Sequence, residues 1–279
     1  MRLKSLKNIL LKNETYVDLR YSSFFLRLWL FLNPSVKIKL KKQNDYYSDF
    51  LRNLKTGSHI AFDIGANEGF VSEVFLERNL EVVAVEPDAR NTAILTSRFV
   101  KNPKFHLWSC AAGGSLGTEK LYSQKDGTAF STINPKWKEL IEKGDYRFHF
   151  LYESETRPVQ LITLDQLIQS HGIPSFIKID VEGYESEVMK GISQKIPLLV
   201  FEANLPEFIN ETFDCLEHLY HIDKKIVFNY SSAFTCGADQ FFSYEDFKHV
   251  LSSLDHRCVD IICIMSNYFD YYHKLPINK

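Results

Sequence analysis

The chain has 279 residues, of which 45% are hydrophobic and 24% charged, and its formal net charge is −2. These are ordinary globular values without an internal repeat or a low-complexity tract, so we expect one large domain, or one domain with additions, around a sizeable core. The five cysteines are odd in number and show no CxxC spacing. This favours a reducing, cytoplasmic location and argues against a disulfide framework or a structural zinc site.

The first 55 residues are basic. They hold 12 Lys and Arg against 4 Asp and Glu (net +8), whereas the remainder holds 21 against 31 (net −10). The apolar run Phe24–Leu32 is interrupted by Arg27 and falls short of the roughly 20 residues of a spanning helix, and no signal-peptide cleavage site follows it. We predict a basic, helical N-terminal extension over 1–55 and a Rossmann-like domain over 56–279. The apolar face of the extension either covers the core or a partner subunit, or lies on a membrane surface.

From residue 59 onward, strand and helix patterns alternate, which predicts a mainly parallel sheet with crossover helices. The expected elements of this part are a strand at Ile60–Asp63, a helix at Phe70–Arg78, a strand at Val82–Glu86, a helix near Thr92–Phe99 and a strand at Phe105–Ser109.

The chain is organised around the stretch IAFDIGANEGF, which begins at Ile60. Asp63 ends the first strand, Gly65 permits a tight turn or a close approach to a ligand, and Gly69 permits close packing of helix on strand. Glu86 ends the second strand 21 residues after Gly65. A carboxylate at that distance is placed to accept hydrogen bonds from ribose hydroxyls, so the two segments predict a nucleoside site.

Two nucleosides compete for this site. A dinucleotide fold favours G-x-G-x-x-G, because its pyrophosphate lies against bare backbone, but Asn67 stands where the second glycine would be. Asp63 is unfavourable beside a phosphate and suits a cationic ligand. S-adenosylmethionine therefore fits better than a nicotinamide dinucleotide, and a nicotinamide-dependent oxidoreductase is the alternative. The glycine turn alone is a weak signal, and Glu86-Pro87-Asp88 strengthens it.

Small residues follow the third strand at Cys110–Gly114, where they leave room for an adenine ring or simply form a tight turn. Residues 115–160 then break the alternation. We expect a strand at Thr118–Tyr122, a turn at Asp126–Thr128 and an aromatic-rich stretch at Lys136–Phe150. This insertion is either a substrate lid over the carboxyl edge of the sheet or a surface excursion.

A second informative region begins at Thr163, a predicted helix N-cap. The strand FIKID then leads to Asp180 and Glu182, whose position at a strand's carboxyl end makes them candidates for metal binding or base catalysis. Lys178 shares a face with Asp180, and a buried ion pair is the favoured interpretation over a catalytic amine. The next strand, Leu198–Asn204, also ends in an acid and an amide.

These motifs occur in order as FDIGANEGF, AVEPD, CAAGG, ITLDQL, FIKIDVEGYESEVMKG and LLVFEAN. Together they resemble the FkbM family of S-adenosylmethionine-dependent methyltransferases over about residues 58–205. The resemblance implies an α/β class I methyltransferase-like, doubly wound sheet of seven strands with the last antiparallel, here after the N-terminal helical extension. Lys225–Asn229 and Asp260–Ile264 would supply the last two strands, although the 30-residue gap between them, with a helix at Tyr244–Leu254, exceeds a tight hairpin.

The resemblance further implies an O-methyltransferase that acts on a hydroxyl of a sugar or glycan, with S-adenosylmethionine as cofactor. The alternative to an enzyme is a non-catalytic module that keeps the fold and binds a partner. The implied catalytic residues are Asp180 and Glu182. The implied cofactor-binding residues are Asp63, Gly65, Ala66, Asn67 and Gly69 for the methionine part, Glu86 for the ribose, and Pro87, Asp88 and Ala111 for the adenine side.

Similarity to metal-dependent O-methyltransferases of the catechol type implies Mg²⁺ at Asp180 and Glu202, with Asn204 close by. The alternative is that these residues only shape the pocket or cap helices. The expected partner is a sugar or glycan acceptor and not a nucleic acid. The basic N-terminus leaves open a homo-oligomer contact and peripheral contact with a membrane surface, which would place a cytoplasmic protein there.

Overall fold

The structure is a computed structural model that describes residues 31–52, 58–99, 101–125, 129–144 and 150–268. The predicted turn at Asp126–Thr128 and most of the apolar run at Phe24–Leu32 lie outside the described residues.

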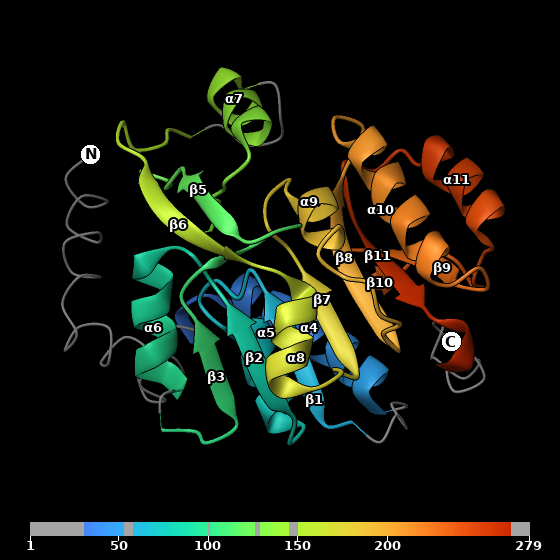
Figure 1. The fold of residues 1–279 in the computed structure, drawn as a ribbon, viewed down its shortest axis with the longest axis horizontal. Coiled ribbons are helices and arrows are strands. Elements are labelled where there is room, and N and C mark those ends of the chain that lie inside the picture. Colours follow the sequence, from blue (N-terminus) through green and yellow to red (C-terminus); the bar gives the residue numbers. More distant parts are fainter. Residues whose placement is uncertain (1–30, 53–57, 100, 126–128, 145–149, 269–279) are drawn as a thin grey trace.

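A central sheet organises the described chain (Figure 1). Its strand order is β10-β9-β11-β8-β7-β1-β2-β3, in which β1, β2, β3, β7 and β8 run parallel and β11 is antiparallel to both β8 and β9. This order confirms the predicted class I sheet with its last strand antiparallel, and β10 adds a two-residue hairpin partner to β9. The strands are β1 (Ile60–Ile64), β2 (Glu81–Val85), β3 (Phe105–Trp108), β7 (Phe176–Ile179), β8 (Leu198–Asn204), β9 (Val227–Ser232), β10 (Thr235–Cys236) and β11 (Cys258–Ile264).

Helices cover both faces of this sheet, as a doubly wound fold requires (Figure 1). One face carries α4 (Pro34–Arg52), α5 (Phe70–Glu77) and α6 (Ala89–Phe99), and the other carries α8 (Leu164–His171), α9 (Glu185–Met189), α10 (Ile209–Ile222) and α11 (Tyr244–Ser253). The short helix η1 (Ser266–Tyr268) follows β11. Helix α11 and strand β10 fill the gap between the last two strands, which explains its length.

Local capping explains two helix starts. Thr163 forms a full capping box with Gln166 at the start of α8, as predicted for its N-cap. Helix α6 begins at Ala89, three residues before the predicted Thr92, because the Asp88 carboxylate accepts the backbone N–H of Arg90 at 2.9 Å.

The predicted insertion at 115–160 builds a second layer beside the carboxyl ends of the main strands (Figure 1). A three-stranded sheet of order β4-β6-β5 joins β4 (Ala111–Ala112), β5 (Gly117–Leu121) and β6 (Arg157–Ile162). Helix α7 (Pro135–Lys143) lies between β5 and β6 in the chain, with Asn134 as its N-cap. Trp137 of α7 is buried against Phe208, so this layer is tied to the main domain.

Helix α4 has two different halves. Its C-terminal half buries Tyr46, Tyr47 and Phe50 in the core, where Tyr47 contacts the ring of Phe176 edge-on. Its N-terminal half is exposed and carries four lysines between Lys37 and Lys42. None of the described helices combines the length and the apolar composition that a membrane crossing requires.

Candidate active site

A cavity lies at the carboxyl ends of β1, β2 and β7, beside the small sheet. It is open to solvent, and the space between its lining residues, open solvent included, is about 560 Å³. It sits where ligands bind in open α/β sheets, at the carboxyl edge beside the reversal of strand order. The predicted site residues that line it are Gly65, Asn67, Glu86, Pro87, Ala111, Asp180 and Glu182.

The turn after β1 brings two strand ends into contact. Gly65 has φ of +80°, and a Cβ on it would overlap the carbonyl oxygen of Asp180 at the end of β7. Asn67 follows with φ of 51°, a left-handed conformation that asparagine tolerates better than most residues. The glycine therefore closes the floor of the cavity, where the tips of β1 and β7 meet.

Gly65→Ala is expected to destabilise the protein strongly, because the methyl group meets backbone that has no room to move and the φ disfavours a side chain. We expect the melting temperature to fall by more than about 5 °C, on the order of 2 kcal/mol for a domain of this size. Gly117→Ala is the matched control, since nothing lies within 4 Å of a Cβ at that position. Equal melting temperatures for the two variants would contradict the tight contact.

Glu86 is buried at the end of β2, and backbone amides hold its carboxylate. The N–H of Asn67 donates to Oε2 and the N–H of Asp88 donates to Oε1, each at 2.8 Å. Burial raises the pKa of Glu86 to about 7 although both hydrogen bonds lower it. The side chain of Asn91 is a further hydrogen-bond donor to this carboxylate, which has about four acceptor sites and so keeps one for a hydroxyl donor. Glu86 is therefore fixed in place and able to accept from a ribose.

Asp63, Ala66, Gly69 and Asp88, four of the predicted cofactor residues, do not line the cavity. Asp63 is completely buried under the glycine turn, where its Oδ2 accepts from the Ser72 hydroxyl at 2.6 Å. Burial raises the pKa of Asp63. The side chain thus supports the turn from beneath.

Asp88 links the start of α6 to the loop before α7. Its carboxylate forms an ion pair with Arg90 at 2.7 Å and accepts the Ser131 hydroxyl at 2.6 Å. Burial would raise the pKa of Asp88, but hydrogen bonding to Arg90 and its charge lower it. Because Ser131 lines the cavity, this pair positions one wall of it.

Lys178 lies inside the sheet between two carboxylates. Its Nζ is 3.1 Å from Asp180 Oδ2 and 3.9 Å from Asp63 Oδ1, and it donates to the carbonyl of Gly65. This confirms the buried ion pair favoured from the sequence. The second oxygen, Asp180 Oδ1, is buried and has no hydrogen-bond partner among the described residues. A buried carboxylate oxygen of this kind calls for a donor, and a bound ligand can supply one.

Three carboxylates meet beside this ion pair. Oxygens of Asp180, Glu182 and Glu202 lie within 4.8 Å of one another. Burial and the charges of Glu202 and Asp180 raise the pKa of Glu182 well above its ordinary value. Glu202 accepts from the amide of Asn204 at 2.9 Å and from the thiol of Cys258 at 3.0 Å. The structure thus brings Glu182 together with Asp180 and Glu202. The amide of Asn204 supports the carboxylate of Glu202.

These carboxylates are of the chemical type that a hard divalent cation such as Mg²⁺ takes as protein ligands. Lys178 already supplies one positive charge to the same group. The repulsion among the three acids is relieved by that charge, by protonation or by a cation.

The buried acids make stability depend on pH. Burial, with Glu202 and Asp180 nearby, raises the pKa of Asp260 to about 7, so the folded protein binds this proton more tightly than the unfolded chain does. The stability from this group is present below its unfolded pKa and lost as pH rises through about 7. Asp260→Asn is expected to leave the melting temperature at pH 4 nearly unchanged and to raise it by at least ~3 °C at pH 8. Exposed Asp239→Asn is the control, and a pH-independent effect of Asp260→Asn would contradict this account.

Some cavity residues were not found from the sequence. Asn91 lies one turn into α6, and Ser131, Thr132 and Ile133 come from the loop before α7. Asn91 follows the EPD motif closely, so its short distance in sequence from Glu86 could have indicated a place in the site. The loop residues belong to no motif, and no local pattern indicates them.

Several solved structures are similar to this chain at low sequence identity. A precorrin-6y C5,15-methyltransferase from Geobacter metallireducens has 14% identity and a TM-score of 0.39, with 77% of this chain and 84% of that chain covered. The plantazolicin methyltransferase BpumL, in complex with a triazolic desmethylPZN analog and SAH, has 9% identity and a TM-score of 0.41, with 94% of this chain and 99% of that chain covered. An O-methyltransferase from Klebsiella pneumoniae, described as putative, has 9% identity and a TM-score of 0.36, with 93% of this chain and 89% of that chain covered. The fold assignment rests on the strand order of the chain itself.

None of the curated proteins compared with the chain matches it. The profile of the methyltransferase FkbM domain, in contrast, matches residues 63–259, which is more than half of the chain and contains both glycine turn and acidic cluster. The chain therefore belongs to the FkbM methyltransferase family and is an S-adenosylmethionine-dependent methyltransferase.

Proposed function

We propose that this enzyme transfers a methyl group to a hydroxyl of a sugar or glycan. The observation that carries the proposal is the buried Asp180 Oδ1, which faces no partner among the described residues at a cavity that Gly65 and Glu86 also line. A hydroxyl donates a hydrogen bond to such an oxygen, and its own oxygen is then turned toward the cofactor side of the cavity.

The chemistry requires removal of the hydroxyl proton. When bound, S-adenosylmethionine supplies a methyl group on a sulfonium. Asp180 would orient the acceptor hydroxyl, and Glu182, whose pKa is raised by burial and by the charges of Glu202 and Asp180, would take the proton. Lys178 would hold Asp180 ionised and fixed through the 3.1 Å ion pair.

The acceptor side of the proposal rests on the insertion. Ser131 and Thr132 bring hydroxyls to the cavity wall. Phe130, which directly precedes Ser131 in sequence, stacks on the ring of Phe150 with 5.0 Å between the centroids, so aromatic surface lies close to this wall in the chain. Polar groups set beside aromatic faces suit a ligand that, like a sugar ring, has hydroxyl edges and apolar faces.

A divalent cation held by the carboxylates of Asp180 and Glu202 is part of this proposal, with Glu182 beside it. Mg²⁺ bound there would lower the pKa of a nearby hydroxyl. Turnover is expected to fall at least tenfold in excess chelator and to return with Mg²⁺ or Mn²⁺, measured as initial rates of label transfer. Full activity in excess chelator would remove the cation and leave Glu182 as the base, visible as an acid-side limb in the rate–pH profile.

The acceptor class is tested by offering methyl-labelled S-adenosylmethionine with oligosaccharides, peptides and RNA in parallel. Label is expected on oligosaccharides alone, as a base-stable ether located by tandem mass spectrometry. Base-labile label would indicate a carboxyl ester, and label on peptide or RNA would contradict a sugar hydroxyl as the acceptor.

A further inference from the structure

Three side chains with metal-binding groups gather far from the cavity, at the β3 edge of the sheet. Glu81 opens β2, His106 lies on β3 and His171 ends α8. His106 is paired in register with Val83, so Glu81, Val83 and His106 point to the same face of the sheet. Helix α8 covers that face. The cluster therefore joins a sheet edge to a helix end, at the amino side of strands whose carboxyl ends form the active site.

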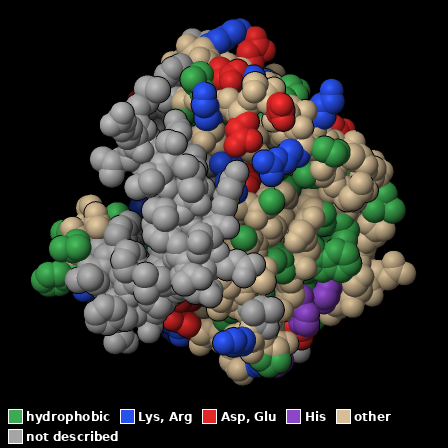
Figure 2. Space-filling model, turned by 90° about the vertical axis from the view of Figure 1, so that its left-hand side faces the viewer, with side chains coloured by type: hydrophobic (Ala, Val, Ile, Leu, Met, Phe, Trp, Pro, Cys, Tyr) green, Lys and Arg blue, Asp and Glu red, His purple; other side chains and the backbone are tan. Residues whose placement is uncertain are grey.

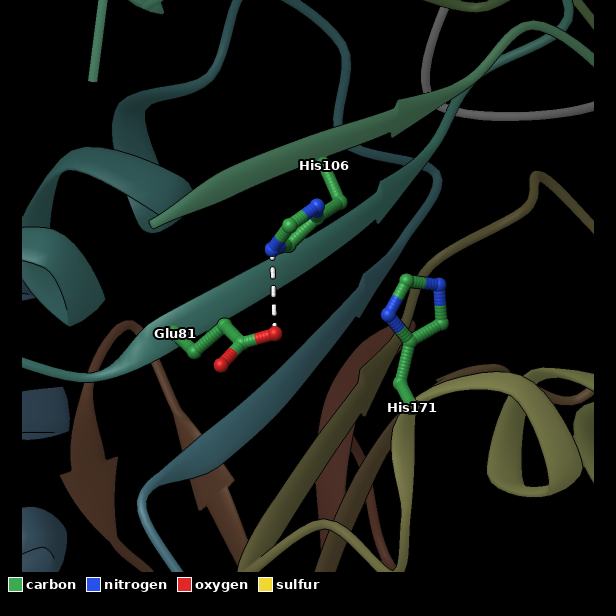
Figure 3. A group of neighbouring side chains, drawn as sticks. All are labelled: Glu81, His106 and His171. Carbon is green, nitrogen blue, oxygen red and sulfur yellow. Dashed lines mark ion pairs between the residues drawn. The ribbon is translucent and has the colours of Figure 1, made fainter. Parts of the chain in front are cut away.

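The geometry brings the three groups within reach of one ion. His106 Nε2 is 3.0 Å from Glu81 Oε1, and one ligand atom from each residue lies within 4.8 Å of the others. Figure 3 shows the His171 ring turned toward this pair. Ligands at about 2.0–2.1 Å from a tetrahedral Zn²⁺ are roughly 3.3 Å apart, so small side-chain movements complete the arrangement. Histidine side chains reach the surface on this side of the molecule, which leaves a path of entry (Figure 2).

We propose that Glu81, His106 and His171 form a binding site for a divalent transition-metal ion of the Zn²⁺ class. Two imidazoles and one carboxylate suit Zn²⁺ or Ni²⁺ and disfavour Mg²⁺, whereas the all-oxygen group near Asp180 has the opposite preference. Three protein ligands leave one position open to water or to a further group. The bound ion ties the edge strand β3 to the end of α8. The cysteine spacing in the sequence argued against a structural zinc site, but this site contains no cysteine, so that spacing does not test it.

Trp108 gives the site its own reporter. Its indole N–H donates to His171 Nε2 at 3.1 Å. A neutral imidazole has one nitrogen with a free lone pair, and a metal bound at either nitrogen uses that lone pair. Metal binding therefore breaks the hydrogen bond from Trp108, whichever ring nitrogen becomes the ligand. The indole environment changes at the moment of binding, and its fluorescence follows.

The test is a calorimetric titration of ZnCl₂ into the metal-free full-length protein, in buffer with millimolar Mg²⁺ to saturate oxygen-only sites. One equivalent of Zn²⁺ is expected to bind, with affinity reduced at least tenfold in His106→Asn and in His171→Asn. His249→Asn, at an exposed position of α11, is the matched control and is expected to bind as the wild type does. Glu81→Gln serves as a third variant that changes only a half-exposed side chain.

Tryptophan fluorescence completes the test. Zn²⁺ is expected to change the emission of the wild type, and Trp108→Phe is expected to lose that change while it still binds the ion. Zn²⁺ affinity that is the same in wild type, His106→Asn and Glu81→Gln overturns the proposal. An emission change that persists in Trp108→Phe overturns the coupling to His171.

Discussion

Asp180→Asn is expected to lower the rate constant for methyl transfer about a hundredfold, the order of magnitude by which a misplaced reacting group slows a reaction. Lys178 only donates hydrogen bonds, so it holds the amide oxygen of the new Asn and turns the amide NH₂ toward the position of Asp180 Oδ1. The amide NH₂, a hydrogen-bond donor, then faces the substrate hydroxyl at the position where a carboxylate oxygen could accept its hydrogen bond. Size and fold are conserved, and the chemistry is lost.

The measurement for this variant is the single-turnover rate at saturating cofactor, together with cofactor affinity. Affinity is expected to change by no more than about threefold, because Asp180 acts on the acceptor side. Asp239→Asn, at an exposed position, controls for the loss of a negative charge and is expected to keep the wild-type rate. A rate within threefold of wild type for Asp180→Asn would remove this residue from the proposed chemistry.

Glu86→Gln is expected to weaken S-adenosylmethionine binding at least tenfold. The carboxylate accepts from the amides of Asn67 and Asp88 and from the side chain of Asn91, and it keeps an acceptor site for a ribose hydroxyl. A charge-assisted hydrogen bond contributes about 1.5–3 kcal/mol. A tenfold loss corresponds to about 1.4 kcal/mol. The NH₂ of a glutamine would also face one backbone N–H, donor against donor, so the loop loses part of its shape.

Calorimetry with S-adenosylhomocysteine measures this effect, and thermal unfolding of the apoprotein separates it from misfolding. Glu155→Gln, an exposed acid on the insertion, is the control for charge. Removal of the whole side chain in Glu86→Ala leaves two buried N–H groups without their partner, so a lower melting temperature is expected there as well. Unchanged affinity in Glu86→Gln would show that the ribose lies elsewhere.

The central part of the site was predictable because it depends on strand ends. Parallel strands present their carboxyl ends at one edge of a sheet, so Gly65, Glu86, Ala111 and Asp180 were expected near one another from their positions in the chain. The antiparallel last strand was predicted as well, although the helix between the last two strands makes their connection longer than a tight hairpin.

Other features depend on contacts between distant segments and leave no local pattern. Asp63 is the second-last residue of β1, which ends at Ile64, and its side chain faces Ser72 and Lys178 beneath the turn and not the cavity. The link from Asp88 to Ser131 spans 43 residues of sequence. Their positions became evident only when register and helix packing were known.

The most direct measurement of this account is a crystal structure of the enzyme with S-adenosylhomocysteine. The account predicts ribose hydroxyls within about 3.2 Å of the Glu86 carboxylate, the methionine part along the turn from Gly65 to Asn67, and the sulfur facing Asp180. S-adenosylhomocysteine bound outside this cavity, or with its ribose away from Glu86, would contradict it.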